Sequence, residues 1–404
     1  MKQQKVVSLI NGKQRGFTLV EFMVASVLGL VVIAGAGSLY SYTKRLNDIG
    51  MTRVSTLQDL RSAATMIGQD ARSAGVFGCA SLGRRYAPDV EASSAGIEIV
   101  QPTGLPAIAQ LQTLDSGVAG SPDGRSAGVR WIPNANVAAT LQDMGVNNLT
   151  VDDNTGGMLL FYYGEGSLSF NSSNGTNQVV FNTNEQHPNQ AVKTVLTTQP
   201  GGYVVAAGCN AIVITPSNGQ HSAATFAVDN VPDVVKTASS PNTPHAILPH
   251  SDMILQRYKV VAYVVGKIAD EPMALYRFEF GNYGDAWSAP QQLAKNVKSM
   301  SADYLFVTDC PSALITDQNT GATVSIPELN GQSFTVQSAD DGNAILDIDP
   351  NKEAQGPSSV RVTLTYDFPN LRGGNIATGD QDQEFNISAV VRGGNVCASR
   401  KVVQ

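Results

Sequence analysis

The chain has 404 residues, of which 42% are hydrophobic and 15% charged, a composition typical of a globular protein. Its length is sufficient for one large or two modest domains beyond a membrane anchor. The net charge of −7 argues against a nucleic-acid-binding surface taken as a whole, because phosphate binding requires clustered Lys and Arg, although a small basic patch remains compatible with it.

An apolar segment lies near the start of the chain. No Asp, Glu, Lys or Arg occurs from Phe22 to Thr43, and ~20 apolar helical residues span the ~30 Å hydrocarbon core of a bilayer. Basic residues precede this segment, which by the positive-inside rule favours a cytoplasmic leader and an exported carboxyl side. No second comparable stretch follows. The sequence therefore predicts a single transmembrane segment at about residues 20–42, with the bulk of the chain in the periplasm or outside the cell.

One carboxylate, Glu21, lies inside the apolar segment. A charge there costs on the order of 2.5–3.5 kcal/mol by insertion scales, so such a residue usually has a partner. Cleavage between Gly16 and Phe17 would create an α-amino group about one helical turn from Glu21, in its own subunit or in a neighbour along a filament. The apolar core follows Gly16, unlike that of a secretory signal, so cleavage would retain the membrane segment. Removing the four positive charges of the leader would change the net charge from −7 to −11.

This stretch resembles the class III leader of type IV pilins and of type II secretion pseudopilins; the matching residues are Gly16, Phe17, Thr18, Leu19, Val20 and Glu21. The resemblance implies cleavage after Gly16 by a prepilin peptidase, N-methylation of Phe17, and a role for Glu21 in setting the register of subunit docking. The other interpretation is an ordinary signal anchor with an incidental Glu. The basic leader, the Gly-Phe junction and the Glu at this spacing together favour the pilin interpretation.

The helical pattern continues beyond the membrane segment. Apolar residues at steps of three and four share one helical face: Leu57, Leu60, Ala64, Ile67, Ala71 and Ala74. No proline occurs from Phe17 to Phe77, and Gly75 and Gly78 supply a stop. The sequence predicts one long helix over residues 17–78, apolar all round in its first half and amphipathic in its second. Major pilins usually carry a kinking proline in the first half, whereas this chain has Ser38 and nearby glycines, which leaves the bend of the helix open.

The end of this helix narrows the resemblance to PilW-type minor pilins, whose pattern Asp-x-Arg-x-Ala-Gly-x-x-Gly-Cys is matched by Asp70, Arg72, Ala74, Gly75, Gly78 and Cys79. The stretch 208–215 resembles the second cysteine region of that family, and 276–279 with 293–304 resembles its late strand–helix–strand unit. The alternative interpretation of Asp70 and Arg72 is a solvated helix surface.

The remainder of the chain has the pattern of β structure. Residues 79–250 predict a loop-rich β region, and residues 251–404 predict a C-terminal β-sheet region with longer strands. The predicted strands are 128–132, 158–163, 178–181, 211–215, 254–265, 274–280, 297–306, 360–368 and 384–391. The predicted fold class is α+β, with the long N-terminal helix packed on an antiparallel β-sheet in an enlarged β-rich globular region.

Four cysteines, Cys79, Cys209, Cys310 and Cys397, lie far apart without a Cys-x-x-Cys pair, which argues against a zinc site or redox motif. Exported proteins keep disulfides, and the sequence does not decide among the three pairings. We favour Cys79–Cys209, which would tie the end of the long helix to the sheet, and Cys310–Cys397, which would pin the C-terminus. The alternative is free buried thiols.

No catalytic or metal-binding pattern is present. The four histidines lie in polar loop contexts, and no nucleophile elbow, phosphate-cradling loop or His-Glu-x-x-His motif occurs. The stretch 347–353 begins like a calcium loop but lacks the glycine and glutamate that complete one. We therefore predict no enzyme activity, no metal and no cofactor.

The resemblance implies a minor pilin that takes part in initiating type IV pilus assembly at or near the pilus tip, supporting twitching motility, adhesion or DNA uptake. Its partners would be other minor pilins, the major pilin, a PilY-type tip adhesin, the prepilin peptidase and the inner membrane, with no direct nucleic-acid contact. The alternatives are a type II secretion pseudopilin and a surface-displayed binding module on a pilin anchor.

Overall fold

The computed structural model describes residues 18–78, 80–82, 98–111, 128–174, 178–182, 195, 202–208, 211–217, 225–228, 253–281, 286–309, 312–316, 323–327, 333–341, 346–349, 352–367 and 382–391. The described residues fall into two units, one comprising residues 18–55 and the other comprising those from Thr56 onward.

Helix α1 (Leu19–Ser73) is 55 residues long and belongs to both units. Hydroxyl groups in its apolar half donate to carbonyl oxygens one turn earlier, as Ser38 does to Gly35 O at 2.8 Å and Ser41 to Gly37 O at 3.0 Å. These polar side chains are therefore satisfied within the helix itself. The helix continues without interruption past Ser38, near which the sequence alone did not decide whether the helix bends.

The predicted amphipathic face of α1 is confirmed in the second unit. Leu60, Ile67 and Ala71 have no exposed surface, and Leu57 and Ala64 pack at the margin of the same core. The predicted stop is also confirmed: the helix ends at Ser73, and Gly75 and Gly78 have φ of 75° and 60°. This left-handed conformation is costly for residues with a Cβ, so the two glycines allow the chain to turn away from the helix.

Among the described residues, the larger sheet has eleven strands. Seven of them follow the order β10-β7-β6-β11-β8-β9-β3; β12 and β5 also pair with β11, β13 pairs with β12, and β4 pairs with β6. All of the pairs are antiparallel except β3 with β9. The strands are β3 (Glu98–Val100), β4 (Val129–Ile132), β5 (Leu149–Thr150), β6 (Met158–Asn174), β7 (Gln178–Asn182), β8 (Tyr203–Ala207), β9 (Ala211–Pro216), β10 (Thr225–Val228), β11 (Ile254–Ile268), β12 (Ala274–Phe280) and β13 (Gln291–Lys295).

A second sheet has, in the part of the chain that the structure describes, four antiparallel strands in the order β17-β14-β20-β21. They are β14 (Val297–Asp309), β17 (Ser333–Ser338), β20 (Ser359–Tyr366) and β21 (Gln383–Val390). Three two-stranded sheets complete the described β structure: β1 (Val76–Phe77) with β2 (Ala80–Ser81), β15 (Ser312–Thr316) with β16 (Thr323–Pro327), and β18 (Leu346–Asp349) with β19 (Lys352–Gln355).

Two expectations about helices were wrong. The stretch 293–304 contains no helix; it forms the end of β13 and much of β14, separated by Asn296 in the left-handed conformation at φ 60°. Alternate residues of β14, such as Ala302, Tyr304 and Phe306, are buried, which is the period of a strand. Conversely, α2 (Asn134–Asp143) lies within the region predicted as β structure and loops, and its Val137 and Leu141 are buried.

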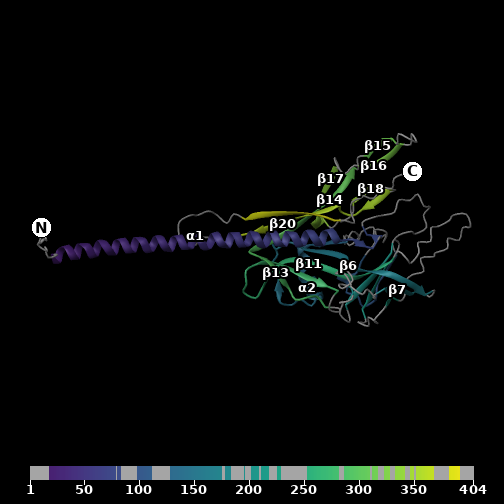
Figure 1. The fold of residues 1–404 in the computed structure, drawn as a ribbon, viewed down its shortest axis with the longest axis horizontal. Helices are drawn as coiled ribbons and strands as arrows, with labels where there is room; N and C mark the ends of the chain where they lie inside the picture. Colours follow the sequence, from purple (N-terminus) through teal and green to yellow (C-terminus); the bar gives the residue numbers. More distant parts are fainter. Residues whose placement is uncertain are drawn as a thin grey trace, which may run out of the picture. The chain divides into compact units, whose positions relative to one another are not determined.

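The described residues of the second unit form two large hydrophobic cores. One is formed where α1, one face of the larger sheet and one face of the four-stranded sheet meet. The other lies on the opposite face of the larger sheet, where α2 and the short 3-10 helix η1 (Ala107–Ala109) pack. Figure 1 shows the end of α1 lying between β20 and the strands β6 and β11. The predicted α+β class, with a long helix packed on antiparallel sheets, is confirmed.

Candidate functional site

The first turn of α1 is closed by a reciprocal pair of capping contacts. The Thr18 backbone N–H and hydroxyl donate to Glu21 Oε2 at 3.1 and 3.0 Å, and the Glu21 N–H donates to Thr18 Oγ1 at 3.3 Å. This is a capping box, which satisfies donors that a helix N-terminus otherwise leaves unpaired. The carboxylate therefore turns back toward the start of its own helix. The predicted junction, Gly16 and Phe17, lies outside the described residues.

After this first turn, the side chains in the apolar half of α1 are exposed in the described structure. Its 18-residue window of highest hydropathy averages 2.3 and has no residue buried within the protein, so by length and composition this helix can cross a membrane. Large side chains such as Leu30 and Ile33 are 66% and 69% exposed. Burying one such side chain is worth roughly 1.5–3 kcal/mol, so this surface strongly favours lipid or other apolar helices over water.

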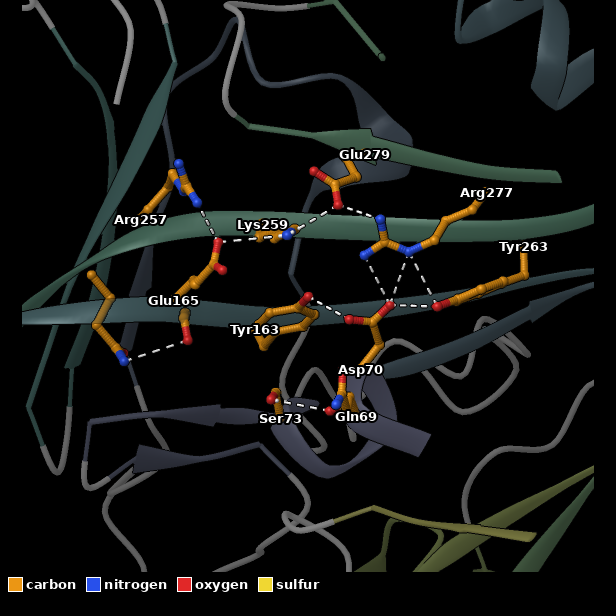
Figure 2. A network of polar contacts seen from close by, with 12 residues as sticks. Gln69, Asp70, Ser73, Tyr163, Glu165, Arg257, Lys259, Tyr263, Arg277 and Glu279 are labelled. Carbon is orange, nitrogen blue, oxygen red and sulfur yellow. Dashed lines mark hydrogen bonds and ion pairs between the residues drawn. The ribbon is translucent and has the colours of Figure 1, made fainter. Parts of the chain in front are cut away.

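At its other end, α1 is held to the larger sheet by a buried carboxylate. Asp70 accepts hydrogen bonds from Tyr163 Oη at 2.7 Å and Tyr263 Oη at 2.5 Å, and from Arg277 Nε and Nη2 at 3.2 and 3.1 Å (Figure 2). Its side chain is only 9% exposed. The solvated-surface interpretation of Asp70 was therefore wrong, because position 70 lies on the buried stripe with Ile67 and Ala71. Arg72 is exposed, as that interpretation predicted.

The contacts of Asp70 continue as a line of alternating charges across β12, β11 and β6. Arg277 pairs with Glu279, Lys259 Nζ lies 3.1 Å from Glu279 Oε1 and 3.5 Å from Glu165 Oε2, and Arg257 Nη2 lies 2.5 Å from that same oxygen (Figure 2). These side chains project from the sheet face that carries α1, because along their strands they lie an even number of residues from Tyr263, Tyr163 and Leu275, which face that core. We call these eight residues the helix clamp: Asp70, Tyr163, Glu165, Arg257, Lys259, Tyr263, Arg277 and Glu279.

Protonation states inside the helix clamp are held by burial and by neighbouring charges. Burial and the adjacent Asp70 raise the pKa of Tyr163 and of Tyr263, so both hydroxyls remain donors. Burial alone would lower the pKa of Arg277, but Asp70, Tyr263 and Glu279 raise it overall. Burial alone would raise the pKa of Glu279, but Lys259 and Arg277 hold it below its ordinary value. The arrangement stabilises a fixed geometry of donors and acceptors around Asp70.

Sequence reasoning missed most of the helix clamp. The available signals were a carboxylate on the apolar stripe of the helix and Arg277 and Glu279 in phase with Leu275 on a half-buried strand. The predicted disulfide residues Cys79, Cys209, Cys310 and Cys397 all lie outside the described residues. Among the residues that are described, no group of three or more His, Cys, Asp and Glu side chains is placed to hold a metal ion.

A family model, the prokaryotic N-terminal methylation motif, matches residues 11–37. The match begins in the basic stretch and continues well into the apolar half of α1, so it includes both Phe17 and Glu21. No curated protein and no solved structure matches the chain. The motif indicates a prepilin of the type IV pilin-like or pseudopilin type. It implies processing by a prepilin peptidase, assembly with other pilins in the membrane, and a single-pass anchor in the inner membrane.

Proposed function

We propose that this chain is a minor pilin that takes part in initiating type IV pilus assembly, and that it resembles the PilW type. The observation that carries the proposal is the methylation motif at the start of a helix with two different halves. The first half is apolar and exposed, and the second half is buried in a large β-rich unit. A helix with these two halves can pack against other helices at one end while carrying a folded unit at the other.

Assembly would use helix packing for affinity and Glu21 for register. Cleavage after Gly16 would leave the new amine of Phe17 one residue before Thr18, whose N–H already donates to Glu21 Oε2. A carboxylate has a second oxygen, so Glu21 could cap its own helix while also accepting an ammonium group of its own or a neighbouring subunit. An ion pair in hydrocarbon favours only one axial offset between helices, because any other offset leaves a charge without its partner.

The position at or near the tip is inferred from size. The described residues of the second unit already include an eleven-stranded and a four-stranded sheet, and such bulk is difficult to repeat along a closely packed shaft. The proposed partners are other minor pilins, the major pilin and a PilY-type tip adhesin, and the globular part would lie in the periplasm before assembly and at the cell surface afterwards. The assembled pilus would serve twitching motility, adhesion or DNA uptake.

We also propose the disulfides Cys79–Cys209 and Cys310–Cys397. A Cβ on Gly78 would lie 2.7 Å from Ala207 O, so the residue directly before Cys79 closely approaches a residue two positions before Cys209. Strands β14 and β21 both run antiparallel to β20, so both end at the same end of the sheet, with Cys310 directly after β14 and Cys397 a few residues beyond β21. Peptide mapping without reduction should recover these two linked pairs; any other pairing contradicts the proposal.

Replacing Glu21 tests the assembly role. We expect Glu21→Ala to leave processing intact, so that mass spectrometry still finds a mature chain beginning at N-methylated Phe17, but to remove the protein from sheared surface pili. Glu21→Gln should fail in the same way, because an amide lacks the charge. Ser26→Ala, on the same exposed helix, should behave as wild type. Normal recovery of Glu21→Ala in pili, or a mature chain beginning at Met1, would refute the proposal.

Deleting the whole chain tests the pseudopilin alternative. A minor pilin is expected to be required for surface piliation and dispensable for protein secretion. Loss of secretion with normal piliation would contradict the minor pilin proposal and identify a secretion pseudopilin instead.

A further inference from the structure

Outside α1, exposed large apolar side chains are confined to one sheet in the part of the chain that the structure describes. Phe334, Val336 and Val390 are 50%, 47% and 54% exposed, and all three belong to the four-stranded sheet. Val336 pairs with Leu305 and Val390 with Ser359, and Leu305 and Ser359 pair with each other. Since directly paired residues share a face, the outward face carries the apolar Val336 and Leu305 at one edge and Val390 at the other, with Ser359 between them.

Strand β17 is an edge without the usual protection. Natural edge strands are commonly guarded against pairing by charges or proline. The six residues of β17, Ser-Phe-Thr-Val-Gln-Ser, include neither, whereas β21 at the opposite edge carries Glu384. No described strand pairs with the outer edge of β17. Its backbone therefore offers donors and acceptors to an additional strand.

Gln337 lies on the other face of β17. It pairs with the buried Tyr304, so its side chain faces the core, and its buried oxygen Oε1 has no hydrogen-bond partner within the described structure. The outer edge of β17 thus combines an open backbone ladder with two exposed apolar side chains on the outward face.

We propose that the outer edge of β17 binds an extended segment of another protein, which adds a fifth strand to this sheet. The edge selects a strand because only a strand matches its backbone spacing, and Phe334 and Val336 select apolar residues at alternate positions. The absence of charge along β17 disfavours a charged partner strand, which would have to be desolvated without a counter-charge. A second copy fits less well, because each copy carries a net charge of −7 and like charges repel. The proposal rests on the proposed function only in taking the partner to be another pilus component.

Site-specific photocross-linking of the full-length chain in piliated cells tests this proposal. A photoreactive phenylalanine analogue at Val336 should give one adduct with a different protein, and the cross-linked peptide should be an uncharged segment with alternating apolar residues. The same analogue at Ser388, an exposed residue of β21 on the same outward face, should give no such adduct. An adduct of twice the chain's mass, an adduct with a charged or helical segment, or no adduct at Val336 would overturn the proposal.

A second pair of variants separates binding from folding. Val336→Lys should reduce recovery of the partner at least tenfold at an unchanged level of the chain, because a charge blocks the edge. Val336→Thr, which keeps a β-branched residue without adding charge, should retain the partner. If Val336→Lys also retains it, the edge proposal fails. The Glu21→Ala result is independent of β17, so loss of Glu21→Ala from pili would still support the proposed function in that case.

Discussion

Truncation of Asp70 is the most informative test of how the helix is joined to the sheet. Asp70→Ala would remove the shared acceptor of Tyr163, Tyr263 and Arg277, all of which are largely buried. Removing one member of a buried ion pair costs about 3–5 kcal/mol, and each buried hydroxyl left without an acceptor costs about 1–3 kcal/mol. These costs do not add fully, and Arg277 keeps Glu279 as a partner. We therefore expect a loss of about 4 kcal/mol, a large part of the ~5–15 kcal/mol by which proteins are stable.

Urea denaturation measures this loss. Both tryptophans, Trp131 and Trp287, are buried in the second unit, so their fluorescence reports its unfolding in the full chain in detergent micelles. With a denaturant slope of at least ~3 kcal/mol/M for a unit of this size, the midpoint should fall by about 1 M. The control Arg72→Ala lies on the exposed side of the same turn and should change stability by less than ~0.5 kcal/mol. Midpoints for Asp70→Ala and Arg72→Ala that agree within error would show that the buried carboxylate does not stabilise the joint.

Two further predictions concern the second unit. The pKa of Glu279 is lowered from 4.5 in the folded state, so its stabilising contribution is complete above about pH 4.5 and is lost as the pH falls through the folded-state pKa; Glu279→Gln should therefore weaken the acid dependence of the urea midpoint. Gly156 and Gly145 both have positive φ, but a Cβ would lie 1.7 Å from Met300 O at Gly156 and meet nothing within 4 Å at Gly145. Gly145→Ala should cost roughly 1–2 kcal/mol and Gly156→Ala at least ~2 kcal/mol more; equal midpoints would contradict the close approach of Gly156 to Met300 of β14.

Local sequence pattern was sufficient to predict the long helix and several of the strands, although not α2. The apolar run of α1, the Thr18–Glu21 spacing, the amphipathic second half and the glycine stop all depend on residues within a few positions of one another. The alternating strand β20 was predicted for the same reason. Within 293–304 the sequence pattern predicted the strand 297–306, which is β14, whereas the helix that the resemblance implied there is wrong.

The methylation motif, the membrane-spanning helix and the α+β class were thus determined by the sequence alone, because composition and short-range periodicity encode them. Tertiary structure alone decided that Asp70 is buried, since its partners Tyr163 and Arg277 are 93 and 207 residues away in the chain. It likewise decided that α1 packs between two sheets and that β17 forms an edge. The physical reason is that charge burial and strand order depend on contacts between distant segments, which leave no periodic signal in either segment.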